Sequence, residues 1–241
     1  MLLAIGAVAA GFINGLAGFG TALFALGFWL QVFPPLQAVA LTVVVASATG
    51  LQGLWIVRRE ILRTRRRLLR FLLPALIGIP IGVWALAYID PDLLKLVVAG
   101  FMLLYGAFFL LRRRLPAFDR PTPVIDRSIG FVSGVLGGLA GLSGALPSMW
   151  CAMRPWPRAE IRAVLQPFNF AILAVTAFIL ALRGAYVPEL LPALGITVVI
   201  ALVAAQVGIA VFKRLGDMQF RWLLIGLMFL SGATLMARTL A

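Results

Sequence analysis

The chain has 241 residues, of which 63% are hydrophobic and 12% charged, with a formal net charge of +13. Its mean hydropathy of +1.06 lies well above that of soluble proteins. Its length suffices for about seven or eight bilayer spans and leaves no room for an additional soluble domain. A single cysteine excludes an intrachain disulfide, and the lack of histidine excludes catalysis, metal sites and proton relays based on that residue. The composition predicts a polytopic membrane protein, and we expect no cofactor, no metal and no enzyme activity.

Four apolar segments make up the first half of the chain. Residues 1–57 carry no charged side chain, whereas residues 58–70 carry seven arginines against Glu60. We predict segments at residues 2–32, 36–57, 71–89 and 93–111. The fourth segment is followed by three arginines and by a proline-containing linker, residues 115–127.

The second half repeats this order. We predict segments at residues 128–153, 163–182, 190–212 and 222–237, with basic connections at 154–162 and 213–221. The chain is therefore expected to be an all-α protein of two four-segment repeats, residues 1–114 and 128–241, joined by the linker.

Each repeat begins with a glycine-rich motif. Residues 11–21 read GFINGLAGFGT, and residues 130–144 read GFVSGVLGGLAGLSG. Glycine in a helix interior costs about 1 kcal/mol relative to alanine, so such a density needs a use. Two uses remain open, namely close packing between membrane helices and a helix break that exposes backbone groups at a transport site.

Charge placement favours a re-entrant hairpin for the first segment of each repeat. If both of these segments crossed the membrane once, 14 of the 21 basic residues would be cytoplasmic; if both are hairpins, 18 of the 21 would be. The positive-inside rule favours the hairpins, with both termini in the periplasm. Three crossings and one hairpin per half make the repeats inverted, as in many secondary transporters. The first segment carries no charge, so a single crossing there remains an alternative.

The candidate substrate contacts are glycines and small polar residues of the two motifs, together with polar residues of the segments that follow. Backbone N–H groups at a helix break carry partial positive charge and favour anions. Gln166 and Asn169 share one helix face beside Pro167, where polar amides are costly unless they face a cavity or a partner. The candidates are Asn14, Gly15, Gly18, Gly20, Thr21, Thr42, Ser133, Gly137, Gly138, Gly141, Ser143, Gln166 and Asn169. Helix packing and interhelical hydrogen bonding remain the alternatives.

Arginines before the sixth segment are candidates for a cytoplasmic mouth. Arg158 and Arg162 could form an electropositive entrance there, and anchoring at the membrane interface is the alternative. The net positive charge is interpreted in the same way, as cytoplasmic anchoring and not as a nucleic-acid surface.

Taken together, these motifs resemble the sulfite exporter (TauE/SafE) family. The likeness is carried by residues 11–20, by PPLQAV at 34–39, by GFVSG at 130–134 and by RAVLQPFN at 162–169, and it extends over essentially the whole chain. The resemblance implies an inner-membrane exporter of sulfite, sulfonates or related sulfur anions. One departure is LAGLSGALP at 139–147, where the commoner family form has a run of three glycines, and we expect it to reshape the second half-site.

We therefore expect a secondary exporter of a small anion that works by alternating access between the two repeats. A passive anion channel and a non-transporting membrane scaffold or assembly factor remain alternatives. The expected partners are the anionic substrate and the lipid bilayer, without nucleic acid, and a homodimer is left open. No Asp or Glu lies in the middle of a predicted segment, which argues against a carboxylate proton relay.

Overall fold

Every secondary-structure element in the described part of the chain is an α-helix. The computed structural model describes residues 1–111, 118, 120–215, 222–223, 225–227, 229, 232–233 and 236, without the side chains of Ile56, Arg59, Leu111, Arg158 and Ala159. The helices are α1 (Leu2–Ala17), α2 (Thr21–Trp29), α3 (Pro35–Leu86), α4 (Pro91–Leu111), α5 (Pro123–Ala140), α6 (Ala145–Cys151), α7 (Arg158–Leu182) and α8 (Leu190–Arg214). Only part of the predicted eighth segment, residues 222–237, falls within the described residues.

Five stretches of these helices are long and apolar enough to cross a membrane. They are Pro35–Trp55 and Glu60–Leu86 in α3, Pro91–Leu110 in α4, Glu160–Leu182 in α7 and Leu190–Arg214 in α8. Large apolar side chains such as Ile77, Phe178 and Val203 are 64–67% exposed on them, as expected of surfaces that contact lipid. The predicted all-α membrane architecture is confirmed at this level.

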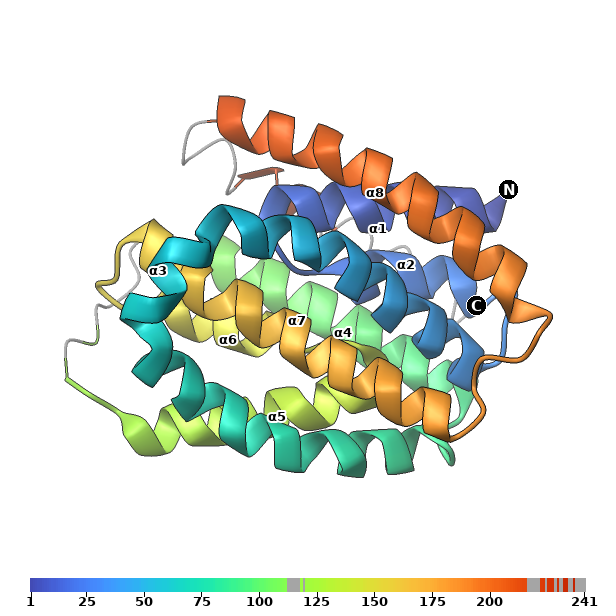
Figure 1. Ribbon diagram of the computed structural model, residues 1–241, viewed down its shortest axis with the longest axis horizontal. Helices are drawn as coiled ribbons and strands as arrows, with labels where there is room; N and C mark the ends of the chain where they lie inside the picture. Colours follow the sequence, from blue (N-terminus) through green and yellow to red (C-terminus); the bar gives the residue numbers. More distant parts are fainter. Residues whose placement is uncertain are drawn as a thin grey trace.

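Helix α3 differs from the prediction, because it continues for 52 residues where two segments and a loop were expected. Figure 1 shows it running along the molecule, turning back at one end and returning, so the chain reverses direction where the loop was placed. Residues 58–70 are helical. They contain neither Gly nor Pro and are rich in Arg and Leu, which are good helix formers. The loop prediction was therefore wrong.

Two other predicted connections also contribute to helices. Residues 123–127, assigned to the linker, begin α5, and residues 158–162, assigned to a basic connection, begin α7. Pro123 occupies the first turn of α5, where its missing N–H costs nothing because that group would have no intrahelical partner.

The two glycine-rich segments each form a pair of antiparallel helices. In the α1–α2 pair, Trp29 at the end of α2 donates its indole N–H to the carbonyl oxygen of Leu3 near the start of α1, at 3.3 Å. In the α5–α6 pair, Trp150 near the end of α6 donates to Oδ1 of Asp126 near the start of α5, at 2.8 Å. The end of the second helix thus lies beside the start of the first in both pairs, and we call these pairs the first and second hairpins.

Glycines bring the first hairpin into backbone contact with α8. A Cβ atom on Gly11 or Gly15 would overlap the carbonyl oxygen of Ala201 or Ala205, respectively. The backbones of α1 and α8 can approach this closely only because these α1 residues lack side chains.

The second hairpin makes the corresponding contact with the returning part of α3. A Cβ atom on Gly130 or Gly134 would overlap the carbonyl oxygen of Phe71 or Ala75. Each hairpin therefore packs on a long helix from the other half of the chain, with glycines four residues apart in both interfaces. Figure 1 shows the α1–α8 contact at one edge of the molecule and the α3–α5 contact at the opposite edge.

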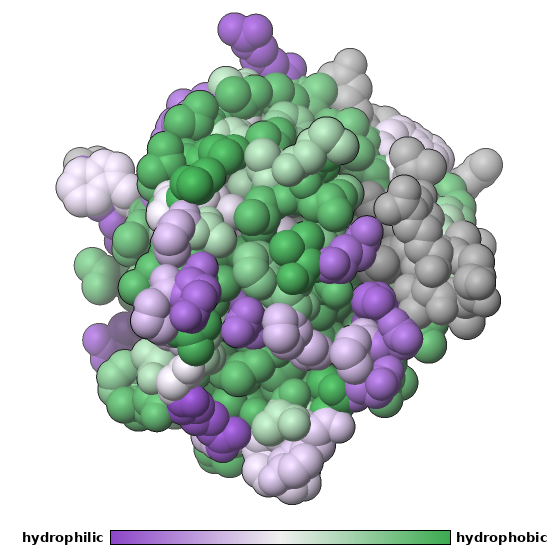
Figure 2. All heavy atoms as spheres, turned by 90° about the vertical axis from the view of Figure 1, so that its right-hand side faces the viewer, coloured by the Kyte–Doolittle hydropathy of each residue, from purple (hydrophilic) through white to green (hydrophobic). Residues whose placement is uncertain are grey.

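Basic residues gather at one end of the molecule. The turn within α3, the start of α5, the start of α7 and the end of α8 all lie toward the left in Figure 1. Figure 2 shows the opposite end, where hydrophilic residues are scattered among apolar ones. We call the end toward the left in Figure 1 the basic end. The basic residues within 112–117 and 216–221, which belong to two of the connections predicted from the sequence, lie outside the described residues.

Candidate functional site

The breaks in the two hairpins meet at one central cavity. Gly18, Gly20 and Gly141 adopt φ values of 78°, 95° and 67°, a left-handed conformation that glycine adopts without strain, and they interrupt the helices there. Residues of both breaks line a cavity of about 20 Å³ together with residues of α3 and α7. This volume accommodates about one water molecule, so the central cavity is too small for a larger ligand in this conformation.

The N-terminus of α2 forms one wall of the central cavity. The first-turn residues Thr21, Ala22 and Leu23 all line it. Their backbone N–H groups have no intrahelical acceptor and carry the partial positive charge of a helix N-terminus. The Thr21 side chain is 2% exposed, and its hydroxyl oxygen has no hydrogen-bond partner among the described residues. This wall therefore combines several unused donors.

A short hydrogen-bond chain joins the two breaks across the cavity. The Ser143 hydroxyl donates to Oδ1 of Asn169 at 2.8 Å, and Nδ2 of Asn169 donates to the carbonyl oxygen of Gly18 at 3.3 Å. Asn169 can donate two hydrogen bonds through Nδ2 and uses one of them within the described residues. It is thus held in place while keeping a donor for a ligand.

Two other predicted contacts line the cavity but bond to α3. Nδ2 of Asn14 donates to Oγ1 of Thr49 at 2.6 Å and to the carbonyl oxygen of Ala46 at 3.3 Å, which uses both of its hydrogens. Nε2 of Gln166 donates to the carbonyl oxygen of Gly50 at 3.2 Å. In this conformation both amides make the interhelical hydrogen bonds that the sequence left open as an alternative.

Five predicted contacts lie away from the lining of the central cavity. These are Gly15, Thr42, Ser133, Gly137 and Gly138. The three glycines lie at close contacts with neighbouring helices or side chains, and Thr42 donates to the carbonyl oxygen of Ala38 at 2.7 Å. Ser133 is fully buried, and its hydroxyl oxygen has no partner among the described residues.

The lining also includes residues that the sequence did not single out. Phe19 lies between the two left-handed glycines of the first break, and its ring centre is 5.6 Å from that of Tyr105. Gly144 leaves room for its neighbours, since a Cβ atom there would lie 2.7 Å from both Nδ2 of Asn169 and Cβ of Phe19. Gly144 could have been identified from the sequence, because it is the last glycine of the second motif.

A larger cavity of about 170 Å³ adjoins the central cavity and shares Gly18 and Gln166 with it. Arg162 lines this larger cavity, with its guanidinium carbon 4.8 Å from the centre of the Phe212 ring. Its Nε is buried and has no partner among the described residues. Arg162 therefore lies next to the central cavity, while the side chain of Arg158 lies outside the described part.

None of the described residues that line the central cavity carries a charge. Within the same described part of the chain, no group of three His, Cys, Asp or Glu residues could hold a metal ion. Neutral donors at a helix N-terminus are suited to holding a small anion.

A protein-family model described as "Sulfite exporter TauE/SafE" matches residues 2–235. The chain belongs to the sulfite exporter TauE/SafE family. The resemblance seen in the two glycine-rich motifs is thereby confirmed. A search of curated proteins gave no match.

Membership of the TauE/SafE family places the chain in a family of membrane transporters. It implies a multi-pass exporter of sulfite or a related sulfur anion, in agreement with the five candidate spans.

Proposed function

We propose that this TauE/SafE protein exports a small, singly charged sulfur oxyanion, either sulfite in its hydrogensulfite form or an organosulfonate, through the central cavity. The observation that carries the proposal is the convergence of the two glycine breaks, from opposite halves of the chain, on one uncharged, donor-rich cavity. First-turn N–H groups of α2, the Thr21 hydroxyl and the free hydrogen of the Asn169 amide would bind the anion's oxygens.

An uncharged site suits export of a monovalent anion. A hydrogen bond to a charged group contributes about 1.5–3 kcal/mol, so a few converging donors give micromolar to millimolar affinity. A buried arginine would add affinity but would slow release of the anion. Arg162, next to the central cavity, is assigned instead to attracting anions from the basic end.

Transport requires the central cavity to widen and to open alternately to each side. Gln166 borders both the central and the larger cavity, so movement of its side chain would connect them toward the basic end. We assign the basic end to the cytoplasm of an inner membrane by the positive-inside rule. The two hairpins then re-enter from opposite sides, and the corresponding glycine interfaces with α8 and α3 support two inverted repeats that move against each other.

Flux of labelled sulfite into proteoliposomes tests this function. We expect saturable uptake that is accelerated by unlabelled sulfite inside, and its loss in Asn169→Asp, which places a carboxylate in the site. Thr176→Val is the matched control, because Thr176 is a fully buried α7 residue that bonds to the carbonyl oxygen of Ile172 and lies outside the lining.

Three results would contradict the proposal. Flux that rises linearly with concentration and shows no exchange would indicate a passive channel. Complete lack of flux in folded wild-type protein would favour a scaffold. Unchanged flux in Asn169→Asp would place the transport site elsewhere.

A further inference from the structure

A third cavity lies at the basic end, apart from the central one. It has a volume of about 430 Å³ and is bounded by the turn of α3, the start of α5 and the connection between α6 and α7. Its charged lining residues are Arg63, Arg66, Arg67, Arg70, Arg120, Arg154, Asp126 and Glu160. Six arginines face two carboxylates there, which leaves a formal surplus of four positive charges. We call it the arginine cavity.

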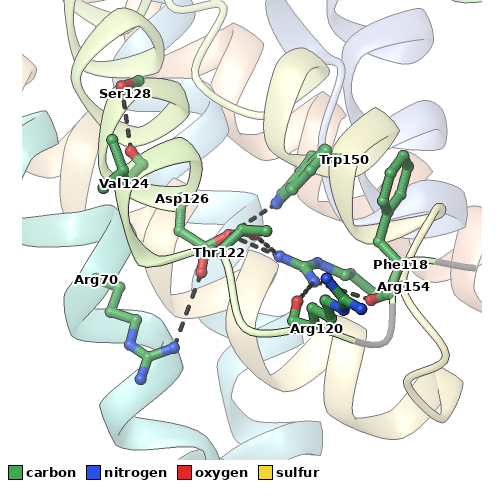
Figure 3. A network of polar contacts seen from close by, with 9 residues as sticks. All are labelled: Arg70, Phe118, Arg120, Thr122, Val124, Asp126, Ser128, Trp150 and Arg154. Atoms are coloured by element: carbon green, nitrogen blue, oxygen red, sulfur yellow. Dashed lines mark hydrogen bonds and ion pairs between the residues drawn. The ribbon is translucent and has the colours of Figure 1, made fainter.

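Both carboxylates of the arginine cavity are already paired. Arg67 forms an ion pair with Glu160, and Arg154 forms one with Asp126 at 3.3 Å. Figure 3 shows Asp126 between Arg154 and Arg70, whose Nη1 lies 4.0 Å from Oδ2 of Asp126. One of the four surplus charges therefore lies at Asp126, which has two arginines beside it, and the other three lie on the remaining arginines.

Three arginines of the cavity have no carboxylate partner among the described residues, namely Arg63, Arg66 and Arg120. They are exposed, so each remains hydrated in the absence of a ligand. A ligand with several negative charges could engage them together, because guanidinium groups bind phosphate through paired hydrogen bonds.

The wall behind these arginines is rigidly built. The Arg154 side chain is 3% exposed and donates to the carbonyl oxygens of Phe118 (2.9 Å) and Arg120 (2.7 Å), as well as to Thr122. Its Nε is buried with no partner in the described part of the chain. The guanidinium carbons of Arg67 and Arg154 lie 4.6 and 5.7 Å from the centre of a Trp156 ring. The fold thus holds positive charge in place before any ligand arrives.

Exposed apolar side chains lie within three residues of the cavity lining on α3 and α5. Leu62 and Leu73 of α3 are 74% and 57% exposed, and Val124 at the start of α5 is 70% exposed. Leu62 and Leu73 lie within the candidate span Glu60–Leu86, and Val124 lies on α5, which packs on that span. A ligand with phosphate groups and acyl chains would match both surfaces, whereas a soluble polyphosphate would match the arginines alone.

We propose that the arginine cavity binds the phosphate headgroup of an anionic phospholipid from the leaflet at the basic end, preferring a headgroup with two phosphates. This site is separate from the anion-transport site. Basic pockets between membrane helices on the cytoplasmic side are suited to such headgroups.

Thermal stabilisation of delipidated protein in detergent tests the proposal, with cardiolipin, phosphatidylethanolamine and soluble tripolyphosphate as separate additions. The test variant changes Arg63, Arg66 and Arg120 to Gln. The control variant changes Arg65, Lys213 and Arg214 to Gln, which removes the same charge from exposed positions of α3 and α8 outside the cavity. Unliganded melting temperatures and elution profiles check that both variants fold.

We expect cardiolipin to stabilise the wild type and the control variant at concentrations where the other two additions have little effect. The test variant should bind cardiolipin roughly 100-fold more weakly, because each basic residue near an anionic headgroup contributes about a factor of five. Equal weakening of cardiolipin binding in both variants would show that net surface charge, and not the arginine cavity, accounts for the effect, which would contradict the proposal. Stabilisation by tripolyphosphate but not by cardiolipin would overturn the lipid assignment.

Discussion

The Thr21 hydroxyl allows a direct test of the central cavity, because it is buried there without a partner among the described residues. Valine has nearly the same shape as threonine but lacks the hydroxyl. If Thr21 donates to the bound anion, Thr21→Val should remove about 1.5–3 kcal/mol of binding free energy and weaken affinity about 10- to 150-fold. The folded protein loses no hydrogen bond among its described residues, so its unliganded stability should stay the same or rise by about 1 kcal/mol.

Ser133 supplies a matched control for this variant. It is also buried with an unpartnered hydroxyl, but it lies outside the lining of the central cavity. Ser133→Ala should therefore change unliganded stability in the same direction as Thr21→Val while leaving anion affinity unchanged.

Titration calorimetry of purified protein with sulfite and methanesulfonate, together with melting temperatures, measures both quantities. If Thr21→Val binds both anions as tightly as the wild type, the α2 wall does not contact substrate. If the Ser133 variant loses affinity to the same extent, the effect is indirect and the reasoning fails.

Four further outcomes follow from the same contacts. In thermal melts, Gly134→Ala should destabilise the protein by about 1–3 kcal/mol or more, because its Cβ would overlap a backbone carbonyl. Gly195→Ala has open space and should be neutral or slightly stabilising, and equal effects of the two variants would contradict the packing assignment. Asn14→Ala should lower unliganded stability by about 1 kcal/mol in such melts, since it removes two bonds to α3, and an unchanged melting temperature would show that these bonds contribute nothing. Methanesulfonate affinity, measured by calorimetry, should stay constant between about pH 6 and 9, because no described lining residue of the central cavity titrates in that range, and a clear pH dependence would reveal a charged participant. Cysteines at the exposed positions Arg65 and Asp92, in a variant without the native cysteine, should react with an impermeant maleimide from opposite membrane faces, and labelling from one face would refute the assigned topology.

Helix positions could be predicted from the sequence where residues that mark helix ends, such as proline or clustered arginines, bound an apolar run. The fourth segment, predicted at 93–111, corresponds to α4 at Pro91–Leu111, because a proline and an arginine cluster bound it. The turn of α3 could not be predicted. A run of arginines between two apolar segments is usually interpreted as a loop, although arginine itself favours helix. Charge alone does not distinguish a hydrated loop from a hydrated helical turn.

The roles of individual glycines were also undecidable from the sequence. Gly15 and Gly18 belong to one motif, yet Gly15 packs against α8 while Gly18 breaks the helix with a positive φ. Both uses require only a missing side chain, so residue type does not separate them. The two asparagines likewise differ only in the fold: Asn14 donates both hydrogens to α3, while Asn169 spans the two breaks.

The contact between α1 and α8 has a consequence for how the chain is made. Ala201, which packs on Gly11, leaves the ribosome 190 residues later (201 minus 11), or about 10–40 s at translation rates of about 5–20 residues per second. Throughout that interval the glycine face of the newly inserted first hairpin lacks its partner and must be covered by lipid, by the insertion machinery or by a neighbouring nascent chain. A ribosome that stalls before α8 would therefore leave in the membrane a hairpin with no partner of its own, open to pairing with the wrong helix and to proteolysis.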